Sequence, residues 1–151
     1  MRTLLILMLC FFVGPLDVLA DELRTKYLTI TLPENWKVIM PLVENQTTST
    51  VIVSTVSGNT SVGFFVGPSS GADAKTIADI FAAQFKSSRT PVEKNGQYTF
   101  SFTQQQTLCQ AWVAAENDVF LVTTLQGDRK AGLVLIKKHV RSEDYASLLP
   151  K

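Results

Sequence analysis

The chain has 151 residues, with 14 Lys and Arg against 13 Asp and Glu, and a formal net charge of +1. A balance this even lacks the concentrated positive charge of nucleic-acid-binding domains, so we expect no nucleic-acid partner. The single histidine, His139, and the two cysteines leave little material for a nucleophilic triad or a zinc site.

The first twenty residues predict a cleavable signal peptide. Arg2 precedes an uncharged apolar run at residues 4–13, and Gly14-Pro15 then interrupts any helix. Val18 and Ala20 place small or modest side chains at the −3 and −1 positions of a cleavage site after Ala20. The apolar run is well short of the roughly 20 residues that a membrane span needs. We therefore expect no stable membrane anchor and a periplasmic or secreted product.

Residues 21–151 are expected to form a single α+β domain, because their number suits one domain of common size. Only Cys109 remains after cleavage, so no disulfide can form within the domain. Residues 108–113 have the pattern of a strand, which predicts a buried and inert thiol. A reactive thiol and pairing with another chain remain alternatives.

Four strands are predicted before the first helix. They are residues 27–32, 36–42, 51–56 and 62–66. Pro41 marks an edge or an end of the second strand, because proline cannot donate to a sheet. Gly58-Asn59 between the third and fourth strands predicts a tight hairpin turn, since both residues tolerate positive φ.

A helix is predicted after the loop Gly67-Pro68-Ser69-Ser70-Gly71. Asp73 is a suitable N-cap, because its carboxylate can accept hydrogen bonds from the free N–H groups of a first turn. Apolar residues then recur at helical spacing over residues 74–85. The loop resembles an anion-binding loop, but it contains no phosphate-binding glycine motif, so we interpret it as a plain connection.

The second half of the sequence predicts four more strands and a second helix. The strands are residues 92–94, 98–102, 108–115 and 119–126. Residues 119–125 are apolar on both faces, which predicts a central strand. Asp128 is expected to cap a helix containing Leu133, Ile136 and Val140, although Leu133–Ile136 also suits a strand. Ser142–Pro150 predicts a last short turn.

This element order predicts an α+β fold in which helices flank an antiparallel sheet, as in an α/β/α sandwich. The pattern resembles the Mog1/PsbP-like fold superfamily over most of residues 25–150. The residues that carry the resemblance are Leu32-Pro33-Glu34-Asn35-Trp36, Gly71-Ala72-Asp73 with the helix 74–85, Gly96–Phe100, the hairpin Trp112–Leu125, Gly127-Asp128 and Ser142–Pro150. The superfamily contains photosystem accessory subunits, a nuclear-transport factor and exported bacterial proteins. The resemblance implies a non-enzymatic accessory or binding module, and it carries over no functional residue.

No catalytic, cofactor or metal site is predicted. Cys109 and His139 are the one conceivable Cys–His pair, but a core-strand cysteine is a poor nucleophile. The carboxylates Glu116 and Asp118 lie in a predicted hairpin turn, and Glu143 and Asp144 lie at a predicted helix start. Turn and cap chemistry explains both pairs better than hydrolysis does.

Two further surface features are visible in the sequence. Lys137, Lys138 and Arg141 form the densest basic cluster, which we interpret as a solvated helix face. Asn45-Gln46-Thr47 and Asn59-Thr60-Ser61 match the N-glycosylation pattern, which has meaning only in a eukaryotic host.

These observations favour an exported, non-enzymatic accessory protein that acts through contacts with another protein. The alternative is a small-ligand carrier with an apolar pocket between sheet and helices, lined by Phe64, Phe81, Phe100 and Trp112. Ordinary core packing explains the same aromatic residues. An enzyme that uses Cys109 or His139 is a third hypothesis. The sequence leaves open the identity of a partner and the oligomeric state.

Overall fold

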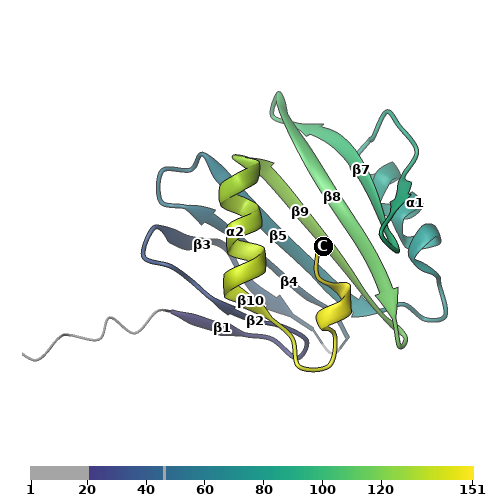
Figure 1. Ribbon diagram of the computed structural model, residues 1–151, viewed down its shortest axis with the longest axis horizontal. Helices are drawn as coiled ribbons and strands as arrows, with labels where there is room; N and C mark the ends of the chain where they lie inside the picture. Colours follow the sequence, from purple (N-terminus) through teal and green to yellow (C-terminus); the bar gives the residue numbers. More distant parts are fainter. Residues whose placement is uncertain (1–20, 46) are drawn as a thin grey trace, which may run out of the picture.

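The computed structural model describes residues 21–45 and 47–151, so the predicted signal peptide lies outside the described residues. Its main feature is a seven-stranded antiparallel sheet with the order β3-β4-β5-β9-β8-β7-β6 (Figure 1). The strands are β3 (Trp36–Glu44), β4 (Ser49–Thr55), β5 (Thr60–Pro68), β6 (Val92–Lys94), β7 (Gln97–Gln104), β8 (Thr107–Glu116) and β9 (Val119–Gly127).

A second, smaller sheet has the order β1-β2-β10. It consists of β1 (Glu22–Arg24), β2 (Thr29–Thr31) and β10 (Val140–Arg141). The sequence predicts the middle strand of this sheet but neither of its neighbours. Val140, expected in the second helix, instead pairs with Ile30 of β2.

The predicted central strand is confirmed, because β9 is the fourth of the seven strands. It pairs with β5 on one side and with β8 on the other. Thr123 of β9 lies opposite Phe64 of β5 and opposite Trp112 of β8. Because alternate residues of a strand point to opposite faces, these three residues share one face of the sheet.

Both predicted helices form, and their predicted N-caps are confirmed. In α1 (Ala74–Gln84), Asp73 accepts a hydrogen bond from the Thr76 N–H at 2.8 Å. In α2 (Arg129–His139), Asp128 accepts one from the Ala131 N–H at 3.0 Å. Leu133–Ile136 is therefore helical. The chain closes with a 3₁₀ turn, η1 (Ala146–Leu148).

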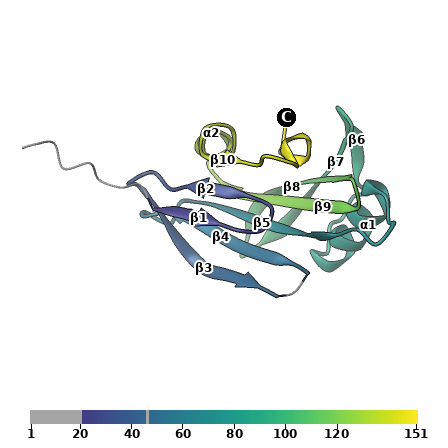
Figure 2. The same ribbon diagram turned by 90° about the horizontal axis from the view of Figure 1, so that it is seen from below.

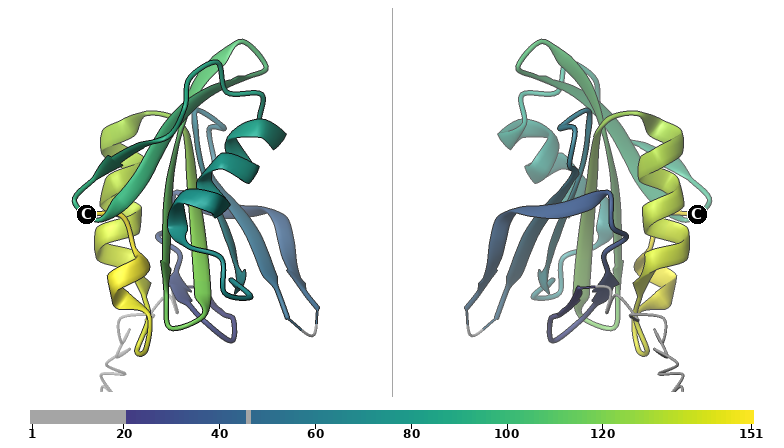
Figure 3. Two further views of the ribbon diagram at one scale, coloured as in Figure 1. Left: turned by 90° about the vertical axis from the view of Figure 1, so that its right-hand side faces the viewer. Right: turned by 90° about the vertical axis from the view of Figure 1, so that its left-hand side faces the viewer.

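The helices lie on opposite faces of the large sheet (Figures 2 and 3). This arrangement is consistent with the α+β class, and it gives the sheet two separate cores. The core on the α2 side also includes the small sheet, and its largest members are Ile30, Trp36, Phe64, Trp112, Leu121, Leu135 and Ile136. The core on the α1 side contains Ile77, Phe100, Phe102, Cys109, Val113 and Val122, with Phe81 and Phe85 packed against it.

The first strand of the large sheet is an edge, as Pro41 predicts. Two register shifts interrupt its pairing with β4, one between Val38 and Met40 and one between Met40 and Val43. At its end, Glu44 accepts hydrogen bonds from the Lys26 N–H at 3.0 Å and the Ser49 hydroxyl at 2.9 Å. These two bonds lower the pKa of the Glu44 carboxyl, because they stabilise its charged form.

Candidate functional site

The outward surface of α2 is the strongest candidate for a functional site. The helix is anchored by its inner side, where Gly132, Leu135 and Ile136 are buried against the sheet. Gly132 permits a close approach, since a Cβ there would lie 1.9 Å from a methyl carbon of Leu125 on β9. The helix therefore presents a fixed outer surface to solvent.

Three layers of side chains make up this outer surface, which we call the α2 face. Arg129 and Lys130 form the first layer, Leu133 and Val134 the second, and Lys137 and Lys138 the third. Val134 is 42% exposed and is one of eight exposed large apolar residues in the described part of the chain. Residues four apart lie on one side of a helix, so the apolar layer is flanked by cations at both ends.

The positive charge of the α2 face is not neutralised locally. The helix contains no Asp or Glu. Within the described ranges, the ion pairs are those of Arg24 with Glu22, Lys75 with Asp79 and Arg141 with Glu22, and none of them involves α2. Four cations therefore remain available to a negatively charged partner.

Shallow depressions border the exposed apolar layer on both sides. One of about 460 Å³ is lined by the six residues of the α2 face. Another of about 370 Å³ lies between the helix and the segment Pro33–Trp36, and Val134 borders both. Val134 therefore separates two shallow surface depressions and presents its apolar side chain to both.

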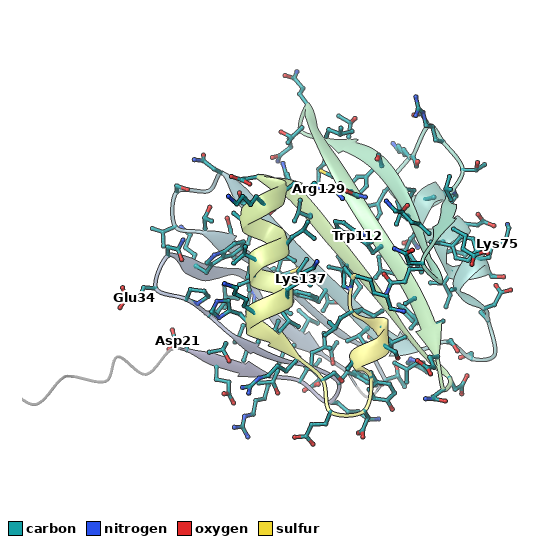
Figure 4. The ribbon with its side chains drawn as sticks, viewed as in Figure 1. Asp21, Glu34, Lys75, Trp112, Arg129 and Lys137 are labelled. Carbon is teal, nitrogen blue, oxygen red and sulfur yellow. The ribbon has the colours of Figure 1, made fainter. Side chains whose placement is uncertain are left out.

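Arg129 is held in place at the start of the helix (Figure 4). Its guanidinium donates a hydrogen bond to the Gln110 side-chain oxygen on β8. The guanidinium carbon lies 5.8 Å from the ring centre of Trp112, within the range of a cation–π contact. Neither contact removes the positive charge of Arg129.

Cys109 and His139 do not form a catalytic pair. Cys109 is 2% exposed in the core on the α1 side, whereas His139 is the last residue of α2 on the other side of the sheet. Burial raises the pKa of the Cys109 thiol, because a thiolate is poorly solvated there. The prediction of a buried thiol is confirmed.

The loop before α1 already holds an internal carboxylate. Asn117 and Asp118 have φ of 51° and 62° and form the predicted tight turn between β8 and β9. The Asp118 carboxylate accepts hydrogen bonds from the Ser69 hydroxyl at 3.1 Å and from the Gly71 N–H at 3.0 Å. The loop is therefore a connection, as predicted, and Asp118 fastens it to the neighbouring hairpin.

The remaining carboxylates of the two predicted pairs are Glu116, Glu143 and Asp144. Glu116 accepts a hydrogen bond from the Ser147 hydroxyl of η1. Glu143 and Asp144 line an open polar cavity of about 670 Å³ beside the small sheet. Among residues 21–45 and 47–151, no group of three or more His, Cys, Asp and Glu is arranged to hold a metal ion.

The four aromatic residues proposed for one apolar pocket lie on opposite faces of the sheet, and that proposal is wrong. Phe64 and Trp112 belong to the core on the α2 side. Phe100 belongs to the core on the α1 side, and Phe81 packs against it. The sheet itself lies between the two pairs, so they cannot line a common cavity.

The predicted basic cluster is correct in part. Lys137 and Lys138 are exposed in the last turn of α2, but the helix ends at His139. Arg141 lies in β10, 4.0 Å from Glu22. Arg129 and Lys130 complete the α2 face but were not predicted to belong to it, although cations at 130 and 138 on either side of Val134 have the spacing of a single helix face.

The asparagines of both glycosylation triplets are exposed in connections between strands. Asn59 is exposed in the hairpin between β4 and β5. Asn45 accepts hydrogen bonds from the N–H groups of Thr47 and Thr48, at 3.0 and 2.7 Å, whereas Gln46 is outside the described residues. In the part of the chain that the structure describes, no helix is long and apolar enough to cross a membrane.

No protein-family model matches the chain. No curated protein sequence matches it either. Among solved structures, it is similar to a crystal structure of a protein from Bacteroides thetaiotaomicron VPI-5482, with a TM-score of 0.46 and 7% sequence identity. That similarity covers 79% of this chain and 46% of the other, so the chain spans less than half the length of that protein.

Proposed function

We propose that this protein is an exported, non-enzymatic accessory protein whose α2 face binds an acidic segment of another protein. The observation that carries the proposal is the exposed Val134, beside the half-buried Leu133, between two layers of cations without acidic partners in the described residues. The signal-peptide pattern of residues 1–20 supports export, and cleavage after Ala20 belongs to the same proposal.

The layout of the α2 face resembles a protein interface. Such interfaces combine an apolar centre with a polar rim, and charge complementarity gives them specificity and speed of association. Here the centre is Val134, and the rim consists of Arg129, Lys130, Lys137 and Lys138. The partner segment should therefore carry an apolar residue with carboxylates on either side.

A membrane surface fits the same face less well. A helix that lies on a membrane presents an apolar stripe along its whole length. The buried side of α2, with Leu135 and Ile136, is directed at the sheet, and its outer side has only one apolar layer. We therefore commit to a protein partner.

Photo-cross-linking tests this function. A photoreactive phenylalanine at Val134 should capture one protein in the native host, and the same group at Ile80 should not. Ile80 is the matched control, because it is 50% exposed on α1 at the opposite face. The captured segment should be acidic, and the purified pair should dissociate as salt is raised.

Charge reversal tests the same proposal by the binding affinity of the purified pair. Lys137→Glu with Lys138→Glu should weaken binding of the purified pair roughly tenfold, because each reversal replaces an attraction worth a fraction of a kcal/mol with a repulsion of similar size. Equal capture at Val134 and Ile80, or an affinity indifferent to both salt and charge reversal, would refute the proposal.

The fold relationship is a separate proposal. We propose an α/β/α sandwich of the Mog1/PsbP-like type for a single domain at residues 21–151. The element order and the placement of α1 and α2 on opposite faces support it. An experimental structure whose strand order departs from that superfamily would count against it.

A small-ligand carrier remains the second candidate. The supporting observation is the cavity of about 670 Å³ between β1, β2 and the segment Val140–Leu149, a volume typical of ligand sites. Its lining includes Glu22, Arg24, Lys26 and Arg141, so a polar or charged ligand suits it better than an apolar one. Native mass spectrometry of the exported protein would show such a ligand as an added mass.

A further inference from the structure

Beside the α2 face, the surface contains a small positively charged notch. It is lined by residues of four parts of the chain: Lys94, Asn95, Gln97, Thr99, Gln110, Trp112, Arg129 and Lys151. No Asp or Glu side chain lines it. Three cations, Lys94, Arg129 and Lys151, thus border one notch, and the Arg129 guanidinium lies over the Trp112 ring.

The size of the notch limits what can enter it. Its volume is about 50 Å³, which is room for a few water molecules. A carboxylate fits that space, whereas a complete cofactor or a drug-sized ligand, which needs several hundred Å³, does not. The notch therefore suits the end of a side chain.

The notch is also preorganised. The Gln110 side-chain oxygen fixes the guanidinium of Arg129, and the ring of Trp112 lies 5.8 Å from the guanidinium carbon. Gln97, which is 3% exposed, donates to the carbonyl groups of Leu148 and Leu149 at 3.3 and 2.9 Å and so ties the end of the chain to β7. Arginine and tryptophan in small, well-defined pockets are the usual anchors of protein interfaces.

We infer that this notch is the specificity pocket of the α2 face and receives one carboxylate of the partner between Arg129 and Lys94, over Trp112. The inference rests on the proposed function. The partner's carboxylate accepts hydrogen bonds from the free N–H groups of Arg129, while its apolar neighbour lies on Val134. The α2 face then recognises a defined acidic residue and not only negative charge in general.

A matched pair of small probes tests the notch without any partner. Acetate carries the carboxylate, and acetamide has the same shape without the charge. In nuclear magnetic resonance spectra at constant ionic strength, acetate should shift the Trp112 indole and Arg129 side-chain signals saturably. Half-saturation is expected on the order of 10 mM, given four heavy atoms in the probe. Acetamide should shift neither signal.

Two variants complete the test. Arg129→Gln should weaken acetate binding about tenfold or more, because a hydrogen bond to a charged group is lost. Lys75→Gln is the control, since Lys75 lies on α1 at the other face and pairs with Asp79 at 2.7 Å. Lys75→Gln should leave acetate binding unchanged, and circular dichroism should show that both variants are folded.

The outcomes separate this inference from the proposed function. Saturable acetate shifts that vanish in Arg129→Gln support the notch even if cross-linking at Val134 captures no protein. A captured partner without any acetate response overturns the notch and leaves the docking function standing. Equal shifts with acetate and acetamide, or shifts that Arg129→Gln does not reduce, also overturn it.

Discussion

Replacing Gly127 with alanine tests whether the junction between β9 and α2 is as tight as the structure shows. Gly127 has a φ of +89°, and it pairs with Thr60 at the start of β5. A Cβ there would lie 1.9 Å from the carbonyl oxygen of Asn59, a backbone atom that cannot simply rotate away. The next residue, Asp128, donates its N–H to the Thr60 hydroxyl at 3.1 Å and caps α2.

The expected loss of stability has two parts. The left-handed backbone costs roughly 1–2 kcal/mol for a residue with a Cβ. Displacing the Asn59–Thr60 backbone adds roughly 1–3 kcal/mol of overpacking. We expect Gly127→Ala to lower the free energy of unfolding by about 3 kcal/mol, which for a domain of this size lowers Tm by roughly 10 °C.

The matched control is Gly58→Ala. Gly58 has a similar φ of +77°, but no atom lies within 4 Å of the Cβ position. It should therefore show only the backbone part, a fall in Tm of roughly 4 °C. Both values come from thermal unfolding followed by circular dichroism. Equal falls in Tm for the two variants would refute the overlap at Gly127.

Three further predictions concern single buried or partnered groups. The Thr123 hydroxyl is buried without a hydrogen-bond partner among the described residues, so Thr123→Val should raise the free energy of unfolding by about 1 kcal/mol, and a decrease seen in denaturant titration would contradict it. The raised pKa and burial of Cys109 predict that Ellman's reagent reacts with it only after unfolding, and rapid reaction in buffer would disprove this. Because the pKa of Glu44 is lower in the folded state, its stabilising effect is present above the unfolded-state pKa and is lost as pH falls through the folded-state pKa. Glu44→Gln should accordingly lose less stability than the parent protein on acidification, and identical pH profiles would show that the two hydrogen bonds contribute nothing.

Features set by local sequence could be predicted. Both helix starts are predicted by their N-caps, Asp73 and Asp128, and α1 also by its apolar stripe. A cap and the first turn of its helix are neighbours in the chain, so the signal is local. The two-sided apolar pattern of residues 119–125 correctly predicts the middle of the sheet, since only a covered strand tolerates it.

Features that depend on contacts between distant residues could not be predicted from the sequence. Strands β1 and β10 have three and two residues, too few for an alternating pattern. Alternation along one strand also does not say which helix it faces, so Phe64 and Phe100 could not be assigned to different cores. The bond between Asp118 and Gly71 joins residues 47 positions apart and leaves no local signal.

The candidate site could be read from the sequence only in part. Lys137 and Lys138 stand out as adjacent cations. Arg129 and Lys130 are also adjacent cations, but the two pairs lie eight positions apart in the sequence, and only helical spacing places them on one face. Trp112 reaches the same region from β8, and nothing in its own strand indicates a cationic neighbour.

The edge strand β3 has a consequence for how the protein can associate. It exposes Ile39, Met40 and Val43, a composition that in a flat, regular edge strand promotes aggregation into fibres. Pro41 removes one backbone donor, and the two register shifts distort the remainder. At the opposite edge, β6 has only three residues. Neither edge of the large sheet offers a long, regular row of backbone groups, so addition of a strand from another chain is disfavoured at both edges.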